Sequence, residues 1–159
     1  MRLTKIQLRK GLLLLSTFAL LTLSSCSKKE EATSSSTSDF RDEMVGTYTG
    51  MEYYTINNGP QLSRTKTVTV SKGSNKSLTL DLGAGLIVNS ADLTSASGNS
   101  FGNIPTQTVV LGATGDATAI GTGVEGKHIG FTSSSKTINY TIKISQTSTV
   151  YDLNFSGKK

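Results

Sequence analysis

Strict alternation of apolar and polar residues near the C-terminus is the feature that most constrains the fold. In residues 137–144 every second side chain is apolar, and residues 150–155 repeat the pattern. Successive side chains of a β-strand point to opposite faces, so this period predicts two strands with one buried face, joined by a short hairpin turn at residues 146–148. The residues expected to point inward are Ile138, Tyr140, Ile142, Ile144, Tyr151, Leu153 and Phe155.

The rest of the chain from residue 41 onward carries similar short apolar runs between Gly, Asn, Ser and Pro punctuation. Such spacing is typical of an all-β sandwich or barrel. We therefore predict that residues 41–159 form an all-β domain, an antiparallel meander of roughly eight strands that closes into a barrel or packs as a β-sandwich. The further strands are expected at residues 47–56, 67–70, 77–82, 86–93, 104–111, 119–124 and 127–131.

The N-terminal segment has a different character. Four bases and no acid precede an uncharged apolar run at residues 11–23. This order is typical of a secretory signal peptide, which we assign to residues 1–25. The run is shorter than the roughly 20 residues that span a bilayer. An uncut anchoring helix is the alternative.

The signal ends at the only cysteine of the chain. Residues 23–26, LSSC, resemble the lipobox of bacterial lipoproteins. The resemblance implies that the chain is cut before Cys26 and that the Cys26 thiol carries a diacylglycerol, so that its acyl chains hold the protein at a membrane. The alternative is a buried free cysteine. A single cysteine excludes a disulfide within the chain.

The residues after Cys26 predict a tether and a location. Residues 32–38 are Ala, Ser and Thr, which cannot bury enough surface to fold, so we assign residues 26–40 to the lipidated cysteine and a disordered Ser/Thr tether. Ser27 stands where lipoproteins kept at the inner membrane commonly have Asp, which implies the outer membrane of a Gram-negative bacterium. Residues 28–31, KKEE, resemble a surface-export tag; a solvated charge cluster is the alternative.

The net charge argues against nucleic acid as a partner. The full chain carries 16 bases and 11 acids, which gives +5. Removal of the signal takes four bases and no acid, which leaves 12 bases, 11 acids and a charge of +1. Nucleic-acid binding needs a clustered basic face, and the sequence shows none.

Patterns for catalysis, cofactors and metals are lacking. Residues 121–126 match GxGxxG, but the next residues read as a strand where a dinucleotide site needs a helix, so we interpret the match as a Gly-rich hairpin turn. His128 is the only histidine and is expected on the surface of a strand. The acids Asp81, Asp92 and Asp116 are isolated from one another, which does not suggest a calcium site. We predict no catalytic, cofactor or metal residues.

Four short motifs together resemble small bacterial surface lipoproteins with a calycin-like β-barrel domain. They are VGTYTG at residues 45–50, IPxQ at residues 104–107, GTG at residues 121–123 and a closing YxxxFxGxK at residues 151–159. The resemblance implies a fold and a location, and it carries over no functional residue. The chain lacks the tryptophan that calycin ligand-binders often have near the first strand, which argues against a lipocalin-style pocket.

One feature suggests a binding surface. Tyr53 and Tyr54 are adjacent in a predicted strand, so one ring points inward and the other outward. An exposed ring can stack on a sugar or a peptide; an ordinary strand tyrosine is the alternative.

These patterns together predict an outer-membrane lipoprotein that is anchored through Cys26 and faces outward. We expect a non-enzymatic binding or accessory module for an envelope protein, a glycan or a small apolar ligand. The alternative is a protease inhibitor of calycin-like type. A hollow barrel would favour a small ligand, whereas a filled barrel with a protruding loop at residues 90–102 would favour protein contact.

Overall fold

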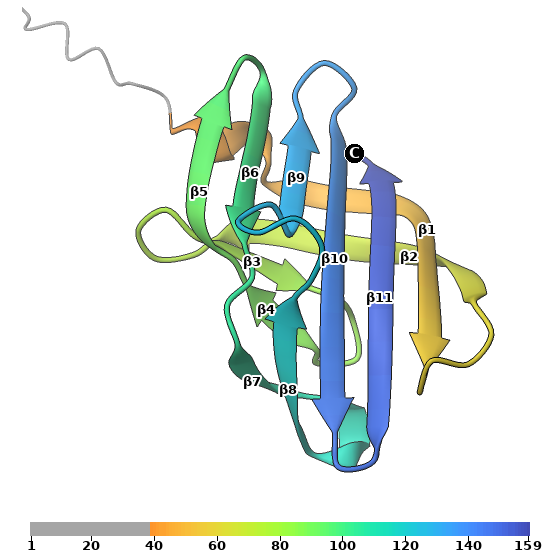
Figure 1. Cartoon of the computed structure of the whole chain (residues 1–159). Coiled ribbons are helices and arrows are strands. Elements are labelled where there is room, and N and C mark those ends of the chain that lie inside the picture. The colour runs from red at the N-terminus through yellow and green to blue at the C-terminus, as the bar shows by residue number, and fades with distance from the viewer. Residues whose placement is uncertain (1–38) are drawn as a thin grey trace, which may run out of the picture. The chain divides into compact units, whose positions relative to one another are not determined.

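The computed structural model describes residues 39–159, which form one antiparallel sheet curled almost into a barrel (Figure 1). The signal peptide, Cys26 and the Ser/Thr tether up to residue 38 lie outside the described residues. The elements are η1 (Phe40–Glu43), β1 (Gly46–Ile56), β2 (Leu62–Lys72), β3 (Leu78–Asp81), β4 (Ile87–Asn89), β5 (Ala91–Ala96), β6 (Asn99–Asn103), β7 (Gln107–Val110), η2 (Gly112–Thr114), β8 (Asp116–Gly121), β9 (Ile129–Thr132), β10 (Thr137–Gln146) and β11 (Thr149–Lys158). Asp39 caps η1, so the described fold takes in Asp39 and Phe40, which the sequence assigned to the tether.

The prediction of an antiparallel meander that forms a barrel is confirmed. β1 pairs with β2 on one side and with β11 on the other, so the first and last strands close the sheet upon itself. β10 pairs with β11 as a hairpin and with both β8 and β9 on its other edge. β8 and β9 therefore lie end to end along β10, as Figure 1 shows.

The structure has eleven strands where roughly eight were expected. The difference arises because three of the positions around the barrel are occupied by two strands end to end: β4 with β5, β6 with β7, and β8 with β9. The interpretation of residues 121–126 as a hairpin turn was wrong, since Gly121 ends β8 and residues 122–126 lie in the break between β8 and β9, which share the partner β10. Residues 90–102 are not a protruding loop, because most of them form the paired strands β5 and β6.

A single side chain bridges the remaining seam of the barrel, between β4 and β7. The Gln107 side chain accepts a hydrogen bond from Asn89 N and donates one to Asn89 O, each at 2.8 Å. The amide thus replaces the backbone pairing that a neighbouring strand would supply to Asn89. The polar residue of the IPxQ motif therefore has a structural role.

The alternating residues line the barrel as predicted. Ile138, Tyr140, Ile142 and Ile144 are buried, and so are Leu153 and Phe155, whereas Tyr151 is partly buried. The rings of Tyr140 and Phe155 stack at 5.0 Å between centroids, since these residues face each other across β10 and β11. The apolar cluster extends through β2, β3 and β4, so these strands share one apolar core with β10 and β11.

The short helix η1 covers one end of the barrel. Behind it, Met44 is fully buried and its carbonyl accepts a hydrogen bond of 2.6 Å from the Tyr48 hydroxyl. Burial raises the pKa of Tyr48 to about 12. Phe40 packs against the same core, so apolar side chains from η1 and the residue after it close this end of the barrel.

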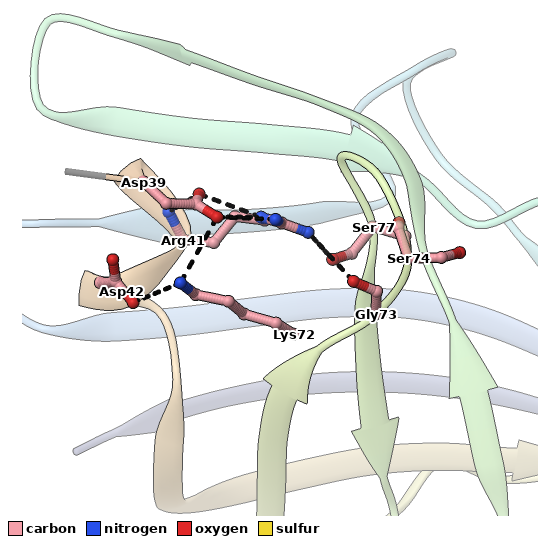
Figure 2. Close-up of polar contacts among 7 residues, drawn as sticks. All are labelled: Asp39, Arg41, Asp42, Lys72, Gly73, Ser74 and Ser77. Carbon is pink, nitrogen blue, oxygen red and sulfur yellow. Dashed lines mark hydrogen bonds and ion pairs between the residues drawn. The ribbon is translucent and has the colours of Figure 1, made fainter. Parts of the chain in front are cut away.

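A polar cluster holds η1 to the β2–β3 turn (Figure 2). The Arg41 guanidinium donates to Gly73 O at 3.2 Å and to Ser77 O at 3.0 Å, and it is paired with the Asp39 carboxylate at 2.6 Å. Lys72 lies 3.4 Å from Asp39 and 2.5 Å from Asp42. The hydrogen bonds from Arg41 hold the pKa of Asp39 well below its usual range.

The two ends of the barrel are a strand length apart. Lys136, just before β10, donates to Glu43 of η1, whereas Gln146, the last residue of β10, donates to Thr114 O of η2. Ten residues of strand span about 30 Å. The end with η1 is hereafter the plugged end, and the end with η2 is the mouth.

Residues 39–159 lie in one compact unit that contains all the strand pairings and the apolar cluster of the described part of the chain. This part therefore has what it needs to fold on its own. No helix among residues 39–159 is long and apolar enough to cross a membrane.

Candidate functional site

A cavity of about 330 Å³ opens at the mouth of the barrel. Its volume falls at the lower end of the range of small-ligand pockets, roughly 300–1,000 Å³. The walls are mostly apolar and contain no carboxylate. The lining residues are Tyr54, Arg64, Ala84, Leu86, Leu111, Gly112, Ala113, Thr114, Ile144, Tyr151 and Leu153.

The apolar walls follow from the alternation of the strands. Ile144 and Leu153 are buried inward residues of β10 and β11, and Leu86 is buried just before β4. Leu111 caps η2 and packs against the core while remaining partly exposed. These residues form an apolar floor at the mouth end of the buried cluster.

A charged pair lies on the inner face beside this floor. Glu52 and Arg64 face each other across β1 and β2. Arg64 Nε donates to Glu52 Oε2 at 2.6 Å, and Arg64 Nη2 also contacts that oxygen. The Glu52 side chain is 0% exposed, whereas that of Arg64 is 49% exposed. The carboxylate of the pair is therefore inside the barrel, whereas the guanidinium reaches solvent.

Tyr140 completes the surroundings of the buried carboxylate. Its hydroxyl donates to Glu52 Oε1 at 3.1 Å, so both oxygens of Glu52 are hydrogen-bonded. Burial and the neighbouring Glu52 charge raise the pKa of Tyr140 far above its ordinary value, which keeps the phenol protonated. A buried charge of this kind is tolerated only when such partners are present.

Tyr54 and Arg64 form the charged edge of the mouth. The Arg64 guanidinium lies over the Tyr54 ring, 4.9 Å from its centroid, which is a cation–π contact. No hydrogen bond or ion pair with residues 39–159 engages Arg64 Nη1. Arg64 is also one of the residues that line the cavity.

Lys66 adds a second cation on the same strand face, two residues from Arg64. Its ammonium lies next to Gly83, whose neighbour Ala84 lines the cavity. Within the described part of the chain Lys66 makes neither an ion pair nor a side-chain hydrogen bond. Partial burial lowers the pKa of Lys66. A partly buried ammonium without a partner is unfavourable, and an anion beside it would relieve that cost.

The two tyrosines predicted as a binding surface have separate positions. Tyr54 points inward and lines the cavity, whereas Tyr53 points outward and is 44% exposed. The alternation is thus as predicted, but only Tyr54 belongs to the mouth. Binding by either residue stays a prediction.

Sequence reasoning missed the charged residues of the mouth. The strand expected at residues 67–70 in fact begins at Leu62, so Arg64 and Lys66 were left outside it. The signal was present, because both residues continue the inward alternation of Val68 and Val70. Glu52 likewise shares its inward parity with Tyr48 and Tyr54.

A second hollow, of about 740 Å³, lies between the β2–β3 turn and the junction of β4 with β5. It is larger than the mouth cavity, but it is lined mainly by Gly, Ser, Thr, Asn and Lys. Ligand sites are mostly apolar with a few convergent polar groups, and the mouth cavity fits that description better.

His128 has a structural position. It lies in the break between β8 and β9 rather than on a strand, and its Nδ1 accepts a hydrogen bond of 3.2 Å from Ile104 N. The His128 ring packs against Gly121 and fills the space that a side chain at position 121 would occupy. Residues 39–159 contain no group of three His, Cys, Asp or Glu side chains that could hold a metal ion.

No family model, curated protein or solved structure gives a match to this chain.

Proposed function

We propose that this protein is a non-enzymatic binding module of the cell envelope, which takes a small ligand at the mouth of its barrel. The observation that carries the proposal is the mouth cavity itself. A mainly apolar hollow of about 330 Å³ with a charged edge lies at one end of the buried apolar cluster. This combination favours a small ligand over the envelope protein or glycan that the sequence also allowed.

The anchor we propose is a diacylglycerol on Cys26, at the outer membrane of a Gram-negative bacterium and with the domain outside the cell. The LSSC motif, the single cysteine and the polar residues after it support this location. Asp39, the first described residue, caps η1 and therefore lies at the plugged end. A membrane anchor upstream of Asp39 therefore joins the domain at the end that has no cavity of this kind.

The ligand site can be tested with a neutral apolar dye. N-phenyl-1-naphthylamine is titrated into a soluble form, residues 27–159, and its fluorescence is followed. We expect saturable binding with one dye per chain. Leu111→Asn places a polar amide in the wall of the mouth, and we expect it to weaken dye binding by about tenfold, because an apolar contact is replaced by an unpaired polar group.

The matched control is Val124→Asn. Val124 is 68% exposed in the break between β8 and β9, so this change has the same chemistry outside the mouth. Dye binding should be unchanged. If the two variants bind the dye alike, or if the wild type binds none, the proposed site is refuted.

The anchor is tested separately, by labelling cells with a radioactive fatty acid. Wild-type protein should carry the label and Cys26→Ser should not, because serine offers no sulfur for a thioether. Ser24→Ala serves as a control that keeps the cysteine. Equal label in wild type and Cys26→Ser would refute the proposed anchor.

A further inference from the structure

We propose that the ligand of the mouth is an organic anion, with an apolar body inside the cavity and a carboxylate, sulfonate or phosphate held by Arg64 and Lys66. This inference rests on the function proposed above, since it names the chemical class of the ligand for the same site. It follows from the placement of three charges on the inner face of β1 and β2.

Two cations and one anion point inward on these neighbouring strands. The cations are Arg64 and Lys66, and the anion is Glu52. Glu52 is completely buried and both its oxygens accept hydrogen bonds from protein groups. The charge that faces the mouth is therefore positive, because the carboxylate lies behind the guanidinium that covers it.

The two cations have unused donors. Arg64 engages Glu52 through Nε and Nη2, so Nη1 has no partner among residues 39–159. The Lys66 ammonium has no hydrogen bond or ion pair within the same residues. An anion between them would gain charge-assisted hydrogen bonds from both side chains, which are the stronger class of hydrogen bond.

Asp81 is the other acid whose charge acts on Lys66. Asp81 points to the outer face of β3, where its carboxylate accepts a hydrogen bond of 2.8 Å from Gly83 N. No carboxylate lines the cavity. The only carboxylate on the inner face beside the described cavity is therefore Glu52, whose charge is compensated by Arg64 and the Tyr140 hydroxyl.

The floor of the cavity defines the rest of the ligand. Leu86, Ile144 and Leu153 provide apolar contacts, and Tyr54 adds a ring whose face is covered by the Arg64 guanidinium. A purely charged ion would leave this surface unused. The fitting ligand is therefore amphipathic, small enough for about 330 Å³, and charged at the side near β2.

Two dyes with the same rings test the inference. 1-Anilinonaphthalene-8-sulfonate carries a sulfonate that N-phenyl-1-naphthylamine lacks. Both are titrated into residues 27–159 at low and high salt. We expect the sulfonated dye to bind about tenfold more tightly at low salt, since charge-assisted hydrogen bonds of this kind contribute roughly one factor of ten or more. The preference should shrink as salt rises.

Lys66→Gln then tests the residue. Lys66 has no protein partner in the described fold, so its loss should leave folding intact. We expect the sulfonated dye to bind about threefold more weakly or worse, and the neutral dye to bind as before. The matched control is Lys76→Gln, which removes an exposed cation from the β2–β3 turn near the plugged end and should change neither affinity.

The outcomes separate this inference from the proposed function. If the neutral dye binds at the mouth but the sulfonated dye binds no better, the anion preference is overturned and the binding site stands. The preference is also overturned if Lys76→Gln weakens the sulfonated dye as much as Lys66→Gln does. If neither dye binds, the proposed site itself fails.

Discussion

Glu52 and Arg64 lie directly opposite each other on the inner face of the barrel, with Arg64 Nε 2.6 Å from Glu52 Oε2. The pair links the packed interior to the mouth, because the carboxylate is buried and the guanidinium is half exposed. Its partner Tyr140 belongs to the strand hairpin that the sequence predicted best. The same contact thus bears on both stability and ligand binding.

The first prediction compares the two cations of β2. Arg64→Met removes the main partner of the buried Glu52 carboxylate and should lower the free energy of unfolding by about 2 kcal/mol or more. Lys66→Met removes a cation without a protein partner and should be neutral or stabilising. Urea unfolding measures both variants, and equal losses would contradict the role assigned to the Glu52–Arg64 pair.

The second prediction concerns the seam between β4 and β7. Gln107→Glu keeps the shape of the side chain but removes the donor to Asn89 O, so two acceptors face each other. We expect a loss of about 1–2 kcal/mol and an Asn89 amide that exchanges about tenfold faster. Thr108→Val, on the outward face of β7, is the control and should leave this amide protected. Unchanged exchange in Gln107→Glu would show that the seam is held by other contacts.

The third prediction is a dependence of stability on acid. Hydrogen bonds from Arg41 lower the pKa of Asp39, and those from Ser133 and Lys136 lower that of Glu43. A carboxyl whose pKa is lower in the folded state stabilises the fold above its unfolded pKa, and this contribution is lost as pH falls through the folded pKa. Stability should therefore decline as pH drops below about 4.

The double variant Asp39→Asn, Glu43→Gln tests that assignment. It removes both carboxylates of the plugged end, so the decline below about pH 4 should become shallower. Asp116→Asn removes an exposed carboxylate near η2 and should leave the decline in place. Thermal melts between pH 6 and pH 2 provide the comparison, and identical pH profiles for the wild type and the double variant would contradict this role of the plugged end.

The fourth prediction tests the register of β10. Ile142 is fully buried, whereas Lys143 faces outward, 3.6 Å from Asp152 on β11. Ile142→Asn should cost about 3 kcal/mol or more, since it loses apolar burial and places an amide in the core. Lys143→Asn should change stability by less than about 1 kcal/mol. The opposite order in urea unfolding would mean that the strand is shifted by one residue.

Sequence alone predicted well the strands in which apolar and polar residues alternate without interruption. β10 and β11 carry an uninterrupted period of two, so their inward residues could be assigned before the structure. β6 was missed because its sequence, NSFGN, has little strand propensity. Its strand conformation comes from pairing with β5 and β9, which is a tertiary effect.

The breaks in the barrel could not be recognised for a related reason. A Gly-rich interruption has the same sequence signature whether the chain reverses or continues along the same line. Residues 121–126 continue toward β9, and only the shared pairing with β10 reveals it. The contact between Arg64 and Glu52 at the mouth also depends on strand pairing, because the register of β1 against β2 places these two residues opposite each other.

The most direct test of the account is a map of methyl chemical shifts in residues 27–159 on addition of N-phenyl-1-naphthylamine. A ligand site at the mouth predicts shifts at Leu86, Leu111, Ile144 and Leu153, and none at Val70 and Leu78, which lie toward the plugged end. Shifts concentrated at Val70 and Leu78, or no saturable shifts at the mouth, would contradict the claim that this barrel binds its ligand at the mouth.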